Sequence, residues 1–150
     1  MPMTNMSLQK IITNIFGAVS FVVPTDWYIG MSSTIPTQAQ NSPPYWNFTE
    51  PAIGVGGYAR ISAANNTTTF GPIASEPSAG FSVQNNITLS YPQSTAAWSS
   101  GTSPLIYAGL FDASTGGNLW AYGPLSSSEQ VNQAGIVISF ALNQVLANFT

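Results

Sequence analysis

The stretch of residues 105–125 constrains the fold of this chain more than any other. Residues 105–111 would be apolar on both faces of an extended strand, which is typical of a strand covered on both sides. The polar residues 112–118 follow, and Gly116 and Gly117 among them accept the positive φ of a turn without a Cβ clash. Because an apolar run resumes after this turn, we predict a β-hairpin at the centre of an all-β domain.

The strand pattern recurs along the chain at roughly ten- to fifteen-residue intervals, which is typical of an antiparallel β protein. Strand-like runs occupy residues 27–31, 58–61, 81–91 and 136–142, and another run ends the chain. The alternation is cleanest over 81–91, where apolar side chains face one way and polar side chains the other. About seven to nine strands at this spacing predict a single domain, residues 1–150, folded as an antiparallel β-sandwich or jelly roll with one short helix.

Residues 5–16 carry the pattern of that N-terminal helix, and Gly17 suits the position after its last turn. The apolar residues fall at helical spacing and form one stripe: Leu8, Ile11, Ile12, Ile15 and Phe16. Two interpretations stay open. The stripe covers one end of the β core, or the helix is an arm that docks on a neighbouring subunit. In the second case, Ile11 and Ile15 are candidate partner contacts.

Two long polar segments, residues 32–49 and 63–80, are expected to be loops. Loops of this length are usually functional, packed against a partner, or mobile. In the first, Tyr45, Trp46 and Phe48 are candidate partner contacts, because aromatic side chains dominate interfaces. The alternative is that the loop folds back and these rings cover the core.

Charged residues make up 5% of the sequence, against roughly 25% in a typical soluble domain. The two basic residues, Lys10 and Arg60, are too few to bind nucleic acid or to form a basic membrane patch. The absence of cysteine and histidine removes disulfides, the usual transition-metal ligands and the commonest general base. We expect no transmembrane helix and no signal peptide. Such a low-charge surface suits a protein packed into a larger assembly.

The five acidic residues are scattered, so the sequence predicts neither a catalytic carboxylate pair nor a calcium loop. We therefore expect no enzyme, no cofactor and no metal site. The only arginine, Arg60, is expected to form a structural ion pair. Glu50 is the candidate partner, and Asp26 and Glu76 are the alternatives.

Several short motifs occur in one order along most of the chain. They are residues 27–37 (WYIGMSSTIPT), 50–51 (EP), 56–60 (GGYAR), 86–89 (NITL), 97–98 (AW), 109–119 (GLFDASTGGNL) and 122–125 (YGPL). Together with the opening helix and the strand around residues 139–141, this set resembles small virion proteins of tailed bacteriophages. Those proteins are labelled tail-fibre, minor structural or capsid decoration proteins.

The resemblance implies a non-enzymatic virion protein, assembled in the cytoplasm of a bacterial host. Its expected partners are other virion proteins, either the major capsid protein or tail proteins, and further copies of itself, with a trimer favoured. A decoration or cement protein on the capsid exterior is the preferred role, and a tail fibre, adaptor or baseplate component is the alternative. The sequence departs from the family in its insertion at residues 38–49.

A carbohydrate-binding module is the alternative from a different class of protein. It is supported by four aromatic residues: Tyr45, Trp46, Trp98 and Trp120. A sugar-binding module would be a monomer that presents these rings as a flat exposed row, whereas a virion part would self-associate and bury them.

Overall fold

The computed structural model describes residues 3–17, 20, 22–38, 46–76, 80–99 and 103–149. Its elements are α1 (Asn5–Phe16), β1 (Asp26–Ser32), β2 (Thr37–Gln38), β3 (Trp46–Asn47), the 3-10 turn η1 (Val55–Gly57), β4 (Ile61–Ala64), β5 (Ala74–Glu76), β6 (Gly80–Gln84), β7 (Leu89–Ser90), β8 (Leu105–Phe111), β9 (Leu119–Glu129), β10 (Ser139–Phe140) and β11 (Leu146–Phe149). Every pair of strands in the described part of the chain is antiparallel, so the prediction of an all-β fold with one short helix is confirmed.

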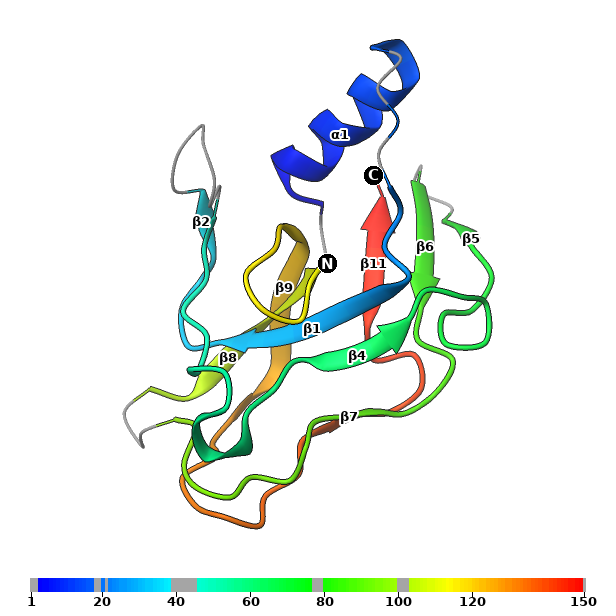
Figure 1. The fold of residues 1–150 in the computed structure, drawn as a ribbon. Helices are drawn as coiled ribbons and strands as arrows, with labels where there is room; N and C mark the ends of the chain where they lie inside the picture. The colour runs from blue at the N-terminus through cyan, green and yellow to red at the C-terminus, as the bar shows by residue number, and fades with distance from the viewer. Residues whose placement is uncertain are drawn as a thin grey trace.

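A four-stranded sheet of order β4-β1-β8-β9 lies at the centre of the molecule (Figure 1). Strands β8 and β9 are the predicted hairpin, and the register pairs Leu110 with Ala121. A shift in register at the start of β9 makes a β-bulge, which leaves Trp120 between two paired positions. The turn has the expected chemistry, because Gly116 and Gly117 both have positive φ and the backbone N–H of Asn118 donates to Asp112 Oδ1 at 2.6 Å.

One face of this sheet forms the main core. Ile29, Met31 and Ala108 on that face belong to one buried cluster with Leu89 and Ile138, which lie on and beside the two-stranded sheet β7-β10. The core therefore lies between one regular sheet and a second layer made of a short ladder and loops. Three rings fill the space between them: Tyr58, Tyr91 and Trp98, with centroids 5.2–6.0 Å apart.

The run at residues 81–91, predicted as one strand, is two strands. Strand β6 pairs with β11 and with β5, whereas β7 pairs with β10. The break begins at Asn85, whose buried side chain donates to the carbonyls of Ile87 and Ala141 and accepts from the N–H of Val145. The prediction of one continuous strand was wrong because a polar side chain there replaces ladder hydrogen bonds with its own.

The segments expected as long loops contain short strands. Strands β2 and β3 form a small hairpin within residues 32–49, and β5 lies within residues 63–80. Strands of two or three residues are too short to produce a periodic pattern, so the sequence gives no signal for them. No helix in the part of the chain that the structure describes is long and apolar enough to cross a membrane.

Candidate functional site

The second face of the central sheet is covered by the segment that starts at Trp46. Two glycines make room for it, because a Cβ at Gly109 would lie 2.7 Å from the Phe48 ring and one at Gly30 would lie 2.5 Å from Glu50 Oε1. Phe48 packs edge-on against Phe111, with ring centroids 5.0 Å apart. The structure therefore places Phe48 and Glu50 over the outer face of β1 and β8.

Trp46 lies on the same outer face, over β9. Its ring is 5.3 Å from the ring of Tyr122, and the side chain is half-buried. Its indole Nε1 is buried and has no hydrogen-bond partner among the residues that the structure describes. Of the three aromatic residues predicted as partner contacts, two are thus packed on the sheet. The third, Tyr45, lies outside the described residues.

Arg60 and Glu50 form a nearly buried ion pair. Arg60 Nη2 lies 2.7 Å from Glu50 Oε2, and Arg60 Nε donates to Glu50 Oε1 at 2.9 Å. The exposed fractions of the two side chains are 5% and 12%. Arg60 Nη1 also donates to the carbonyls of Ala113 and Gly116, both at 2.8 Å. The arginine therefore ties the segment at Glu50 to the turn between β8 and β9, and its guanidinium carbon lies 3.5 Å from the centre of the Phe111 ring.

Tyr58 connects this ion pair to the core. Its hydroxyl donates to Glu50 Oε1 at 2.8 Å and accepts from the N–H of Met31 at 3.0 Å, on the side of β1 where the pairing with β4 has ended. Burial, followed by the nearby carboxylate of Glu50, raises the pKa of Tyr58 well above its usual value. The same causes, with Tyr58 itself as a neighbour, raise the pKa of Tyr91. Both phenols therefore stay neutral at physiological pH.

The turn at Asp112 is held by a further set of hydrogen bonds. Partial burial by itself would raise the pKa of the Asp112 carboxyl. The bonds from the side chain and backbone of Asn118, and from the indole of Trp120, outweigh burial and lower this pKa. The ionised carboxylate is thus the form that the turn requires.

A hollow of about 530 Å³ lies between the start of α1, the segment at Trp46 and this turn. We call it the Arg60 hollow; its lining includes Met6, Trp46, Glu50, Arg60 and Phe111. The charged side chains Glu50, Arg60 and Asp112 all have partners within the chain. Among the described residues, no three His, Cys, Asp or Glu side chains lie close enough to hold a metal ion.

Helix α1 is attached to the bulge of β9 by its first turn. The N-cap residue Thr4 donates its hydroxyl to the carbonyl of Leu119 at 2.8 Å, and its N–H donates to the carbonyl of Trp120 at 2.8 Å. The hydroxyl of Ser7 also donates to the carbonyl of Trp120, at 2.5 Å. One turn further on, Lys10 Nζ lies 5.5 Å from the Trp120 ring. The helix thus turns Met6 together with small polar and basic side chains toward the sheet.

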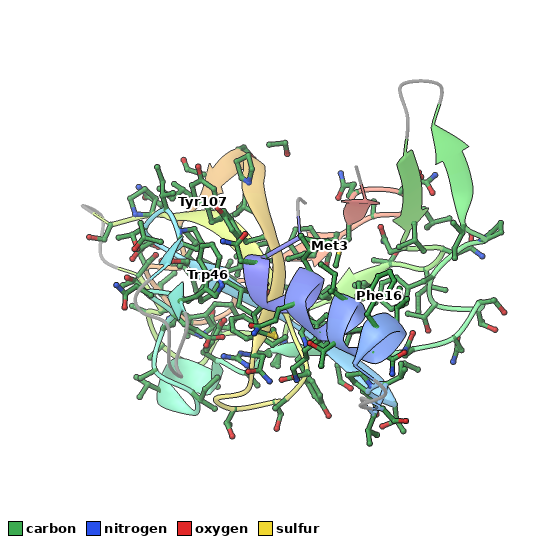
Figure 2. The ribbon with its side chains drawn as sticks, turned by 90° about the horizontal axis from the view of Figure 1, so that it is seen from above. Met3, Phe16, Trp46 and Tyr107 are labelled. Atoms are coloured by element: carbon green, nitrogen blue, oxygen red, sulfur yellow. The ribbon has the colours of Figure 1, made fainter. Side chains whose placement is uncertain are left out.

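The apolar stripe of α1 faces away from the protein. Leu8 is 51% exposed, Ile15 is 64% exposed and Phe16 is 83% exposed, whereas Ile11 at the edge of the stripe is half-buried. Figure 2 shows α1 lying across the top of the molecule, with Met3 before its first turn, beside the region of Trp46, and Phe16 at the far end. The interpretation that this stripe covers the core was wrong, because the first turn is fixed to β9 through its polar face.

The structure brings four of the predicted residues together and separates the others. Trp46, Phe48, Glu50 and Arg60 meet at the Arg60 hollow, whereas Ile11 and Ile15 lie on α1. The aromatic row expected of a carbohydrate-binding module does not form among the described residues, since Trp98 and Trp120 are buried. Sequence reasoning missed the two glycines that make room for this segment, Gly30 and Gly109. The available signal was the position of each glycine inside an apolar strand.

Fold and site together define an all-β domain in which buried ionic and aromatic contacts fix the loops while one apolar helix face stays open. Comparison with known protein families identifies the class of protein. The family described as Podophage GP4 fiber I protein gp80 matches residues 2–148, and the chain belongs to this family. No curated protein matches the chain. The resemblance to small tailed-phage virion proteins is confirmed, and the protein is a structural component of a phage virion.

Proposed function

We propose that this protein is a non-enzymatic component of a phage fibre, and that copies of it associate through the apolar face of α1. The family description, which names a fibre protein, supports the fibre role over that of a decoration protein on the capsid exterior. The observation that carries the proposed association is the orientation of α1, whose apolar stripe points away from its own sheet. A second copy of the chain is the occupant of that stripe, and a trimer is the expected assembly.

The charge distribution of α1 favours association with the same helix of a second copy of the chain. Lys10 is the only charged residue of the helix, and it lies over Trp120 rather than on the stripe. Burying the stripe against a second copy therefore brings no like charges together and leaves no unpaired charge in the interface. Exposed apolar side chains continue beyond the helix at Val22 and Val23, which are 92% and 55% exposed. Exposed apolar side chains gathered on one face of a helix, as on α1, are typical of a protein interface.

The proposal that the protein is not an enzyme is supported by the state of its ionisable groups. Glu50 and Arg60 bind each other, and the two buried tyrosines are held neutral. A general acid or base needs a pKa near the working pH and access to a substrate. Glu50 and Arg60 are nearly buried and bound to each other, so neither is free to act on a substrate.

Light scattering behind a sizing column tests the association. We expect wild-type protein to run as an oligomer and the double variant Ile12→Ser/Ile15→Ser to run as a monomer with an unchanged circular dichroism spectrum. Ile73→Ser is the matched control, because Ile73 is at least as exposed as Ile12 and Ile15 but lies outside α1. A wild-type monomer at high concentration, or an oligomer that survives the double substitution, would contradict assembly through α1.

The location in the virion needs a separate measurement. Antibody labelling of intact particles, viewed by electron microscopy, should place the protein on fibres. Labelling spread over the capsid exterior would instead support the decoration role.

A further inference from the structure

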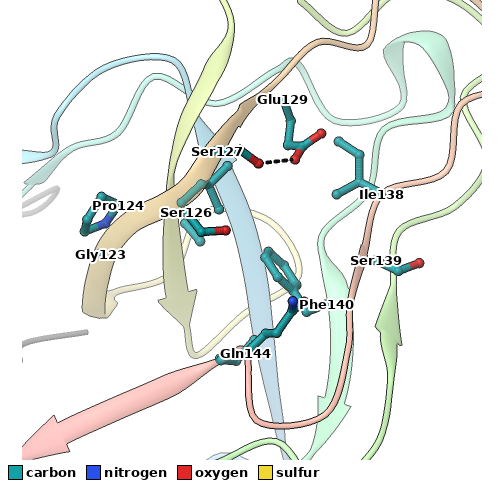
Figure 3. A pocket seen from close by; sticks show the side chains of 12 residues that line it. Gly123, Pro124, Ser126, Ser127, Glu129, Ile138, Ser139, Phe140 and Gln144 are labelled. Atoms are coloured by element: carbon teal, nitrogen blue, oxygen red, sulfur yellow. Dashed lines mark hydrogen bonds between the residues drawn. The ribbon is translucent and has the colours of Figure 1, made fainter.

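A second hollow, of about 590 Å³, lies between the end of β9 and residues 138–145. We call it the β9–β10 hollow. Figure 3 shows Ser127 and Glu129 on the side of β9, with Ile138, Ser139 and Phe140 on the opposite side. It takes no part in the interactions of α1 or in the Arg60 hollow. Its volume is within the range of sites that hold small molecules, which is roughly 300–1,000 Å³.

Glu129 supplies a hydrogen-bond acceptor in this hollow. One of its carboxylate oxygens, Oε1, accepts a hydrogen bond from the hydroxyl of Ser127 at 3.1 Å. Oxygen Oε2 has no partner among the residues that the structure describes. The contact with Ser127 restricts the rotation of the carboxylate. Its second oxygen, Oε2, can therefore accept a hydrogen bond from a hydroxyl group of a ligand.

Gln144 supplies a hydrogen-bond donor. Its side-chain oxygen accepts from the N–H of Ala141 at 2.7 Å, which fixes the amide group. The amide nitrogen, with two N–H groups, has no partner in the described part of the chain. A fixed acceptor and a fixed donor within one hollow match the hydroxyl groups of a sugar, each of which both donates and accepts.

Phe140 supplies an apolar wall. Its ring is half-buried and lies 6.2 Å from the ring of Tyr91, in an edge contact that limits its rotation. Leu125 and Ile138 also line the hollow. A pyranose ring presents C–H groups on its faces and hydroxyls around its rim, so it can meet an aromatic ring and polar side chains at the same time.

The charge of the hollow selects among sugars. Among the described residues that line it, Glu129 is the only charged one, and neither Lys10 nor Arg60 belongs to this lining. A carboxylated, sulfated or phosphorylated sugar would bring a second negative charge close to Glu129 without a cation to offset it. A neutral sugar avoids this repulsion.

From these contacts we propose that the β9–β10 hollow binds a neutral sugar unit of a glycan. The inference does not depend on the fibre role or on association through α1, because it uses different residues. It also differs from the aromatic-row arrangement expected from the sequence, whose tryptophans lie elsewhere or are buried.

A glycan array probed with the labelled full-length protein tests the inference, with neutral and acidic oligosaccharides printed side by side. We expect binding to a subset of neutral glycans. The variants Glu129→Gln and Gln144→Ala should each lower that signal at least tenfold. Asp26→Asn removes the same charge elsewhere, and Ser128→Ala changes a β9 residue outside the lining, so both should bind as wild type does.

Circular dichroism of each variant separates a lost contact from a lost fold. The Ile12→Ser/Ile15→Ser variant should keep its sugar binding even if it no longer associates, which distinguishes failure of this inference from failure of the proposed assembly. Absence of binding to any neutral glycan, binding to acidic glycans alone, or equal binding by the Glu129→Gln and Gln144→Ala variants would each overturn the proposal.

Discussion

At the scale of single residues, Glu50 and Arg60 join three parts of the chain that are distant in sequence. Glu50 holds the segment on the outer face of the sheet, Tyr58 links it to β1, and Arg60 links it to the turn before β9. Each group is nearly buried, so each depends on the others to remain paired. Removing either charge leaves the other in a site that water hardly reaches.

Arg60→Met should therefore lower the free energy of unfolding by about 3–5 kcal/mol, as breaking a buried ion pair does. The double variant Glu50→Met/Arg60→Met should lose less than the sum of the two single variants, because neither charge is then left unpaired. Urea unfolding followed by tryptophan fluorescence measures both. Lys10→Met, which removes the other basic residue at a more exposed position, should cost no more than about 1 kcal/mol. Additive losses in the double variant would show that the pair is not coupled.

At the scale of elements, much of the structure follows from the sequence. Helix α1 has the bounds that its apolar spacing indicates, and the β8-β9 hairpin has the predicted turn. The direction in which α1 presents its stripe could not be predicted, because an apolar stripe looks the same whether it faces the core or a partner. Hydrogen bonds from Thr4 and Ser7 to the bulge at Trp120 decide it, and these join residues more than a hundred positions apart.

The candidate site shows the same division between local and long-range information. With so few charges, the pairing of Arg60 with Glu50 could be guessed, since the choice lay among a handful of carboxylates. The packing of Phe48 against Gly109 could not be predicted, because nothing in either segment marks the other as its neighbour. The break at Asn85 was missed since an alternating pattern hides a buried polar side chain.

The attachment of α1 gives a prediction at this scale. In the double variant Thr4→Val/Ser7→Ala, the carbonyls of Leu119 and Trp120 lose hydroxyl partners in a buried contact. We expect the free energy of opening of α1 to fall by about 1–3 kcal/mol while the central sheet keeps its protection. Hydrogen exchange read residue by residue measures this difference. Thr13→Val is the control, because the Thr13 hydroxyl bonds only to the carbonyl of Gln9 in its own helix. Loss of protection in β1 and β8 as well would contradict independent docking of α1.

At the scale of the whole molecule, buried aromatic rings hold the two layers of the fold together in a chain with 5% charged residues. The two layers meet at three buried rings, and the hydroxyls of Tyr58 and Tyr91 bind β1 at Met31 and Ile29. Met31 lies beyond the last pair between β1 and β4, Ile29 with Ile61, and its N–H donates to the Tyr58 hydroxyl instead. Core packing and sheet hydrogen bonding therefore depend on the same two phenols in their neutral form.

This dependence predicts a loss of stability at alkaline pH. Burial raises the pKa of both phenols in the folded protein, so up to about pH 10 they are neutral in the folded and unfolded states alike, and stability is unaffected. Above pH 10 only the unfolded chain ionises them, and the free energy of unfolding should fall by about 1.4 kcal/mol per pH unit for each tyrosine. Urea unfolding between pH 9 and about pH 12 measures this slope. Tyr58→Phe should be less stable at neutral pH, because Glu50 and Met31 lose their partner, yet its slope above pH 10 should be shallower by one tyrosine. Equal slopes in wild type and variant, or a phenolate absorbance from Tyr58 in the folded protein near pH 10, would show that the ring is not held neutral.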